Sequence, residues 1–213
     1  MEVLRTNVQL KTPFKRFLVS GMFGQAGVLI AQIVSTSLLL PFKMMEIDMQ
    51  NYTAVFGYTT GLAALLALIS GPIWGIISDR TVLSFGRRRI WILVGGIGGT
   101  FPLVGIGLAT SVTQVMVWWC ISSIFFGANW AMMNTLVADQ VDEDKRGTYG
   151  GITGLIGPLG TVLGIGFISL LTSKSISFKF NLVAAIGIIF IIIELMLVKE
   201  GRMEYKKLLK EKR

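Results

Sequence analysis

The sequence predicts an all-α membrane protein with six transmembrane helices, and three observations lead to that fold class. Of the 213 residues, 53% are hydrophobic and only 15% are charged, whereas a soluble domain would have about a quarter charged residues. The uncharged residues form long runs, which is the pattern of segments that cross a bilayer. No run alternates between apolar and polar residues as barrel strands do, so the spanning segments are expected to be helices.

Six apolar runs are each long enough, at ~1.5 Å per residue, to cross a hydrocarbon layer of ~30 Å. Residues 1–16 are expected to form a cytoplasmic segment, residues 17–199 the transmembrane bundle, and residues 200–213 a basic cytoplasmic tail. The expected helices cover residues 17–41, 53–78, 90–110, 114–138, 149–172 and 180–198.

The basic residues predict how the bundle is oriented. Seventeen of the 20 lysines and arginines lie before the first helix, in the 79–89 and 139–147 loops, or after the last helix. The other three, Lys43, Lys174 and Lys179, lie in the opposite loops. Cytoplasmic loops are enriched in lysine and arginine, so we expect a multi-pass protein of the cell membrane with both termini in the cytoplasm. The net charge of +8 has the same origin, and no nucleic-acid partner is expected.

Two glutamines in the first helix are candidates for binding a substrate. Gln25 and Gln32 are seven residues apart, so they share one face of a helix on either side of its midpoint. A buried amide is costly in hydrocarbon unless it finds a hydrogen-bond partner. A substrate and a neighbouring helix are equally good partners, and both interpretations stay open.

Five pairs of glycines are spaced four residues apart. This spacing removes side chains from one helix face and lets another helix approach closely, so it predicts a tightly packed bundle. The pairs are Gly57 and Gly61, Gly71 and Gly75, Gly95 and Gly99, Gly150 and Gly154, and Gly160 and Gly164.

The loop between the second and third helices holds the most specific motif. It joins two apolar segments through four arginines and one aspartate, which a tight turn at one membrane face accommodates. The pattern consists of Gly75, Asp79, Arg80, Gly86, Arg87 and Arg88. This stretch resembles the loop between helices 2 and 3 of the major facilitator superfamily of secondary transporters. The five residues between its two parts resemble the sucrose-type and glycoside-pentoside-hexuronide cation symporter branches.

A second, weaker copy of this pattern follows the fourth helix. Asp139 ends that helix, and Arg146 with Gly147 opens the next. In the resembled family, each half consists of two inverted three-helix repeats, and a second copy agrees with that plan. Asn129 near the middle of the fourth helix, and Asn134 nearer the cytoplasm, are further candidates for binding a substrate. Packing against a neighbouring helix is the alternative for Asn129.

The resemblance implies one half of a twelve-helix fold that works by alternating access. In that family, the charged motif closes the cytoplasmic side of a central site, and breaking its contacts lets the two halves rock. Asp79 would meet the positive end of a helix in the other half, and Arg87 with its neighbours would pair with cytoplasmic acids. The resembled branches imply symport of a sugar or glycoside, with a second six-helix half or a homodimer as partner.

Two further features concern the fifth and sixth helices. Gly157-Pro158 partly resembles the glycine-proline motif of drug antiporters, but Thr161-Val162 stands where that motif has two glycines. We therefore interpret the pair as a helix kink. Glu194 lies about one turn from the cytoplasmic end of the sixth helix and is expected to reach the membrane interface.

Several classes of site are not expected. The chain has no histidine and its acidic residues lie almost entirely in loops, so no catalytic set can be drawn and an enzyme is not predicted. Neither a metal site nor a cofactor is predicted. The glycoside symporters use acidic residues within helices 1, 2 and 4, which this sequence lacks. Coupling to H+ or Na+ is therefore not evident in this half.

Three functions compete on this evidence. The first is the amino-terminal half of a facilitator-type transporter for a sugar or glycoside. The second is a non-functional truncated transporter fragment, and the third is an accessory or scaffold subunit of a membrane complex. Uptake of labelled sugar by vesicles that hold this chain, alone or with a second half, would distinguish the first from the others.

Overall fold

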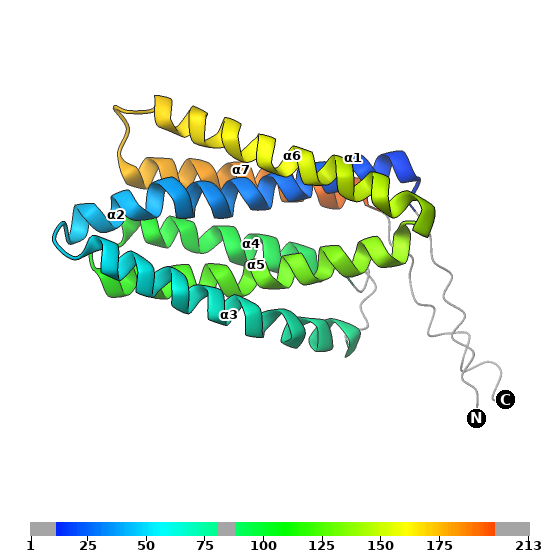
Figure 1. Ribbon diagram of the computed structural model, residues 1–213, viewed down its shortest axis with the longest axis horizontal. Helices are drawn as coiled ribbons and strands as arrows, with labels where there is room; N and C mark the ends of the chain where they lie inside the picture. The colour runs from blue at the N-terminus through cyan, green and yellow to red at the C-terminus, as the bar shows by residue number, and fades with distance from the viewer. Residues whose placement is uncertain (1–11, 81–87, 199–213) are drawn as a thin grey trace.

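The computed structural model describes residues 12–80 and 88–198, and these residues form helices joined by short connections, with no strand among them. Six of these helical stretches are long and apolar enough to cross a membrane. They lie alongside one another and follow the long axis of the molecule (Figure 1). The predicted all-α class with six transmembrane helices is therefore confirmed.

The first span is one continuous helix with three parts. α1 covers Phe14–Leu29, the π-helical segment η1 covers Ile30–Leu39, and α2 covers Leu40–Ile47. This helix is longer than predicted. Lys43 and Glu46, which were expected in a loop, lie in its last turns and form an ion pair at 3.3 Å.

The remaining five spans agree with the predicted helices except at their ends. The largest difference is at the start of α6, where Glu143 and Asp144 form the first helical turn instead of a loop. Carboxylates are favourable there because the amino end of a helix dipole is positive. The helices are α3 (Tyr52–Arg80), α4 (Arg89–Leu108), α5 (Val112–Gln140), α6 (Glu143–Leu170) and α7 (Ile176–Leu197).

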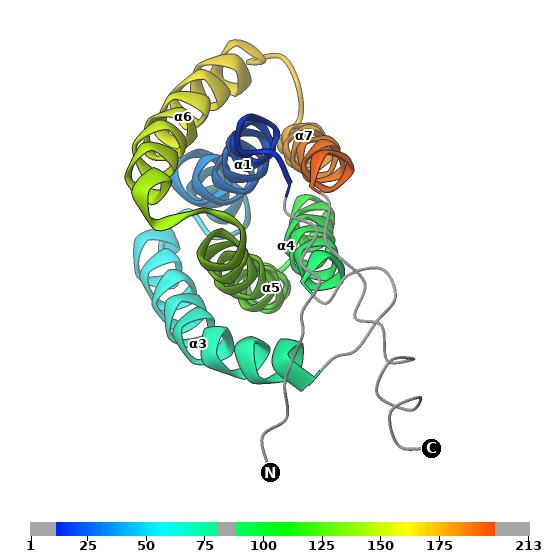
Figure 2. The same cartoon turned by 90° about the vertical axis from the view of Figure 1, so that its right-hand side faces the viewer.

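The helices divide into a packed group and two peripheral members. Viewed along the bundle, α1 and α5 lie in the middle, α4 and α7 on one side, and α3 and α6 towards the other (Figure 2). α4 packs on α5 and α7, α1 packs on α6 and α7, and α3 packs on α5. In the most apolar stretch of each span, 11% of α3 and 22% of α6 is buried, against 39% to 56% in the other four. α3 and α6 therefore present most of their apolar surface outwards.

Close packing at glycines is confirmed for two of the five predicted pairs. A Cβ atom on Gly95 would lie 2.7 Å from the main-chain nitrogen of Asn129, and Gly99 is similarly crowded by a side chain of α5. Gly160 and Gly164 meet side chains of the first span at 3.4 Å and 3.2 Å. These glycines let α4 approach α5, and α6 approach the first span, more closely than larger residues would allow.

For the other three pairs, the expected close packing within the bundle is wrong. In the part of the chain that the structure describes, no atom of a neighbouring helix would lie within 4 Å of a Cβ atom at these positions. They lie on the two peripheral helices, where fewer neighbours are present. They are Gly57, Gly61, Gly71 and Gly75 of α3, and Gly150 and Gly154 of α6.

The two predicted motif regions lie at the same end of the bundle. The start of α1, the end of α3, the start of α4, the turn from α5 to α6, and the end of α7 come together there (Figure 1). The α2–α3, α4–α5 and α6–α7 connections lie at the other end. This arrangement agrees with the predicted topology, while the membrane side that each end faces stays a prediction.

Candidate functional site

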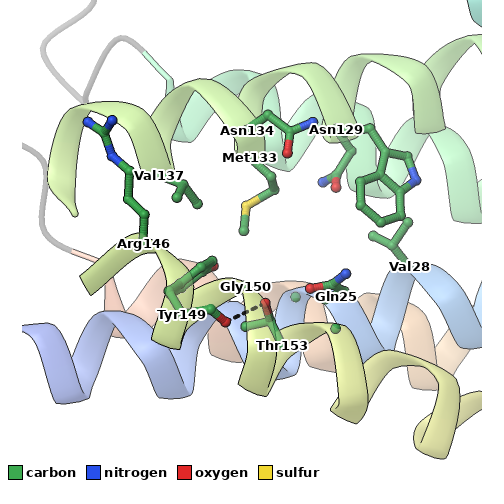
Figure 3. A pocket seen from close by; sticks show the side chains of 13 residues that line it. Gln25, Val28, Asn129, Met133, Asn134, Val137, Arg146, Tyr149, Gly150 and Thr153 are labelled. Atoms are coloured by element: carbon green, nitrogen blue, oxygen red, sulfur yellow. Dashed lines mark hydrogen bonds between the residues drawn. The ribbon is translucent and has the colours of Figure 1, made fainter. Parts of the chain in front are cut away.

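A cavity of about 250 Å³ lies between α1, α5 and α6. Figure 3 shows α5 forming one wall, with α1 and α6 opposite. Arg146 lies at one end of the cavity, and Gln25, Val28 and Asn129 lie towards the other. The cavity therefore extends from the charged end of the bundle towards its middle.

Glycines of α6 provide much of the space. Gly150 and Gly154 line the cavity, and a Cβ atom at either position would enter open space. Their spacing places them on one helix face, as predicted. That face borders the cavity instead of packing against another of the described helices.

Three of the four predicted substrate-binding amides line the cavity, namely Gln25, Asn129 and Asn134. The side chain of Asn129 is almost fully buried, and its Nδ2 donates a hydrogen bond of 3.2 Å to the carbonyl of Ile92 in α4. Both interpretations of Asn129 thus have a geometric basis, because the residue borders the cavity and also joins two helices. Gln25 and Asn134 stay candidates for binding a substrate.

Gln32, the fourth amide, does not line the cavity. Its Oε1 accepts a hydrogen bond of 3.4 Å from the indole nitrogen of Trp130, which does line the cavity. The predicted shared face of Gln25 and Gln32 assumed an unbroken α-helix. η1 begins at Ile30, between them, so α-helical spacing does not hold across the pair. Gln32 has the helix-to-helix role that its other interpretation predicted.

The first charged motif has one ion pair that the structure describes. Arg88, buried just before α4, pairs with the partly exposed carboxylate of Asp139 in α5 and also donates to the carbonyl of Thr135. This contact joins the two motif copies, and it matches the expectation that the arginines next to Arg87 pair with acids. Asp79 and Arg80 are the last residues of α3, whereas Gly86 and Arg87 lie outside the described residues.

The second motif copy holds the end of α5. The Nε of Arg146 donates to the carbonyl of Val141 at 3.1 Å, and its Nη2 donates to that of Ala138 at 2.8 Å. The last carbonyls of a helix lack partners within it, so a guanidinium group is favourable there. Gly147 follows directly after the first turn of α6, with open space beside it. Arg146 therefore fixes the corner between α5 and α6 while bordering the cavity.

Sequence reasoning missed most of the apolar lining. Trp130 and Met133 of α5 and Tyr149 of α6 also line the cavity. In a helix that is apolar on every side, the periodicity does not indicate which face borders a cavity. The sequence feature that could have indicated this lining was the presence of Trp130, Asn129 and Asn134 in one helix.

Glu194 corrects another expectation. It was expected at the membrane interface, but its side chain is 0% exposed and lies against Gly24 of α1. Distance from the helix end was the basis of that prediction. The direction of the side chain depends on how α7 packs on α1, which the spacing does not show.

Comparisons with known proteins agree with this architecture. Residues 16–213 match the sequence profile of the Major Facilitator Superfamily. Multidrug resistance protein 3 of Bacillus subtilis (strain 168) is 26% identical over 152 residues, which are 70% of this chain and 28% of that protein. Multidrug resistance protein MdtG of Proteus mirabilis (strain HI4320) is 28% identical over 136 residues, 58% of this chain and 32% of that protein.

A third relative has a similar match. Multidrug resistance protein MdtG of Erwinia billingiae (strain Eb661) is 27% identical over 120 residues, 54% of this chain and 28% of that protein. The chain thus spans no more than 32% of the length of these three relatives. All three are named for multidrug resistance, so they give no support to the predicted sucrose-type or glycoside branch.

Proposed function

This chain belongs to the Major Facilitator Superfamily of membrane transporters, and we propose that it forms one half of a transporter for small amphipathic organic molecules. The superfamily consists of transporters and not of enzymes. In this proposal, the cavity between α1, α5 and α6 is one side of a central binding site. A second six-helix unit, either another chain or a second copy, covers the cavity. Rocking of the two units then exposes the site to each side of the membrane in turn.

The composition of the cavity wall is the observation that carries the proposal. Val28, Trp130 and Met133 offer apolar and aromatic surface, while Gln25 and Asn134 offer amides. Binding sites for organic molecules are mostly apolar, with a few polar groups that orient the ligand. Methionine adapts to differently shaped ligands, and tryptophan combines an apolar ring with a polar N–H. Such a wall suits amphipathic molecules, in agreement with the names of the relatives.

The size and position of the cavity support the need for a second unit. A volume of about 250 Å³ is below the ~300–1,000 Å³ of complete sites for organic ligands. α3 and α6 lie on the same side of the bundle as each other, outside α5 and α1 (Figure 2). Their apolar faces are largely exposed, and the glycines of α3 make its surface easy to approach. A partner that docks on α3 and α6 would close the cavity.

A sugar substrate remains the alternative prediction from sequence. Gln25 and Asn134 are suited to bind hydroxyl groups, and this observation favours it. A sugar, however, needs a partner for nearly every hydroxyl, because an unsatisfied polar group is costly once it is buried.

The Gly157-Pro158 pair, which we interpreted as a kink, partly resembles the glycine-proline motif of drug antiporters. The names of the relatives favour this second interpretation of the pair.

Ligand binding to the chain in lipid nanodiscs tests this proposal. Rhodamine 6G, an amphipathic organic cation, is expected to quench the fluorescence of Trp130, because that indole borders the cavity. Trp130→Phe should remove most of the quenching. Trp91→Phe, which removes an indole that is packed on Trp74 outside the cavity, should retain it.

The same titration distinguishes the alternatives. Quenching or competition by sucrose, without any effect of rhodamine, would favour the sugar substrate. A folded chain that binds neither compound would contradict the proposal and favour a non-functional fragment or a scaffold subunit. Transport is then measured in proteoliposomes, and it is expected only where a second six-helix unit is present or the chain dimerises.

A further inference from the structure

Glu194 is an ionisable residue that the cavity wall does not include. It lies in the last turn of α7, and its side chain is 0% exposed. Neither carboxyl oxygen has a hydrogen-bond partner among residues 12–80 and 88–198. A charged carboxylate is costly to bury without a partner, and acidic residues inside membrane helices typically mark ion or proton pathways. The position therefore calls for a functional explanation.

The carboxyl group lies directly behind the cavity wall. A Cβ atom added to Gly24 of α1 would overlap the carboxyl carbon and both oxygens of Glu194. Gly24 also lines the cavity. The carboxyl group thus contacts a glycine that also lines the cavity, and Gly24 has no side chain to separate the two.

Three neighbouring helices place ionisable residues at this end of α7 or against the same stretch of α1. From α1, Arg16 donates to the carbonyl of Met196 at 3.0 Å, and from α4, Arg89 donates to the carbonyl of Leu195. From α6, Tyr149 lies against Gly21, one turn from Gly24, and lines the cavity. η1, which also packs on α7, has no ionisable residue.

The two arginines contact the main chain of this end of α7 and not the carboxyl group. Both hold the main chain of the residues that follow Glu194, and neither forms a hydrogen bond with its carboxyl oxygens. Positive charges at this end of α7 favour a carboxylate there after a proton has left. The carboxyl group as it stands, buried and without a hydrogen-bond partner among the described residues, is suited to the neutral acid.

We propose that Glu194 is a proton-binding site that exchanges its proton with the cavity past Gly24. When water reaches the carboxyl group, its O–H bond breaks, the proton passes to a water molecule in the cavity, and the negative charge stays on Glu194. The reverse step restores the neutral acid. This inference rests on the proposed function, because it couples a proton to the occupancy of the same cavity.

Chemical modification tests the site on the full chain in nanodiscs. Dicyclohexylcarbodiimide reacts with protonated carboxyl groups in apolar surroundings, and mass spectrometry of peptides locates the product. Modification of Glu194 is expected to fall as the pH rises, and Glu194→Gln should abolish it. No modification at any pH, or equal modification at every pH, would overturn the proposal.

Matched variants test the contact with Gly24. Gly24→Ala should displace the carboxyl and shift the pH midpoint of modification. Gly154→Ala, on α6 in the lining of the same cavity, where a Cβ atom meets open space and does not contact Glu194, should leave the midpoint unchanged. Glu46→Gln, which removes a largely exposed carboxyl, should leave modification of Glu194 intact. The same midpoint in Gly24→Ala and the unaltered chain would overturn the role of this contact. Circular dichroism confirms that each variant is folded.

The outcome is separable from that of the proposed function. If rhodamine 6G binds and modification of Glu194 fails, the proton site is wrong and the binding site stands. If modification depends on pH and no ligand quenches Trp130, the proton site stands and the substrate proposal is wrong.

Discussion

Among the described residues, four arginines at one end of the bundle bind main-chain carbonyls near helix ends. Arg88 and Arg146 bind carbonyls of the last turns of α5 or just beyond it, and Arg16 and Arg89 bind carbonyls of the last turn of α7. Positive charge is favourable at this end of a helix dipole. These residues thus hold helices together in addition to their expected effect on topology.

Among the ion pairs at this end of the bundle, the pair of Arg88 with Asp139 is expected to contribute most to stability. Arg88→Ala should lower the free energy of unfolding by about 1–3 kcal/mol, because it leaves Asp139 without its cation and opens a buried position. Asp139→Asn should lower the free energy of unfolding by less, since that side chain is partly exposed and the amide oxygen of asparagine still accepts a hydrogen bond. Thermal unfolding in detergent measures both.

Glu143→Gln is the matched control for Arg88→Ala. It removes a pair in which Glu143 is 90% exposed and 3.7 Å from Arg146. The expected loss is below about 0.5 kcal/mol, as for other exposed pairs. Equal losses in Arg88→Ala and Glu143→Gln would contradict a special role for the buried pair.

At the level of single residues, sequence reasoning predicted which groups interact better than it predicted the side of the helix on which each side chain lies. The arginine-rich motif predicted that arginines would meet acids, and Arg88 meets Asp139. Glu194 was placed correctly along its helix, but its side chain is buried against α1 instead of reaching outwards, because the side on which a residue lies depends on the packing of α7 against α1. The cavity-lining role of Tyr149 had no sequence signal for the same reason.

Glycine pairs with identical spacing have different roles in different helices. In α4, Gly95 lies against the main chain of α5, whereas in α3 no atom of another described helix approaches Gly57 or Gly61. The spacing shows that a helix face is free of side chains. It does not show whether a helix, a cavity or the surroundings of the bundle occupies that face.

Alanine substitutions should separate these roles. Gly95→Ala should lower the free energy of unfolding by about 1–3 kcal/mol, because the added carbon meets the main chain of Asn129, which cannot move aside easily. Gly61→Ala should leave it unchanged or raise it by up to about 1 kcal/mol, since alanine favours a helix. Both are measured by thermal unfolding of the chain alone. A destabilised Gly61→Ala would show that α3 is already covered, for example by a second copy.

The six spans were predictable because the cost of burying polar groups in lipid acts on whole segments. Helix ends were less predictable, since they depend on local effects. Glu143 and Asp144 begin α6 because their charges suit its amino end. In the first span, the Lys43–Glu46 ion pair forms within the helix, so that helix continues through residues that resemble a loop.

At the scale of the molecule, the orientation in the membrane is open to a direct test. Cys120 is the only cysteine of the chain, so Cys120→Ser gives a background for single cysteines. Lys145→Cys places a cysteine at the end of the bundle that holds both motif regions. Lys174→Cys places one in the connection from α6 to α7 at the other end. In intact cells, a membrane-impermeant maleimide should label the second variant and not the first. The opposite pattern would reverse the predicted topology.

The overall architecture followed from hydrophobicity and one loop motif, whereas the substrate did not. Recognition of a ligand depends on which side chains of α1, α5 and α6 face the same space. Of that lining, only Gln25, Asn129 and Asn134 were predicted to bind a substrate. The resemblance to sugar symporters depended on the motif of residues 75–88, whereas the residues that line the cavity belong to α1, α5 and α6.

Gly150 and Gly154 leave part of the cavity wall without side chains, and this has a consequence for how mutations can change the cavity. Each of these positions has room for a larger side chain with no main-chain obstacle beside it. Exchanges there can narrow or reshape the space while the remaining helices keep their places. Under the proposed function, single exchanges at these two positions would change which compounds bind while leaving folding intact, so this scaffold would have a low barrier to acquiring different selectivities.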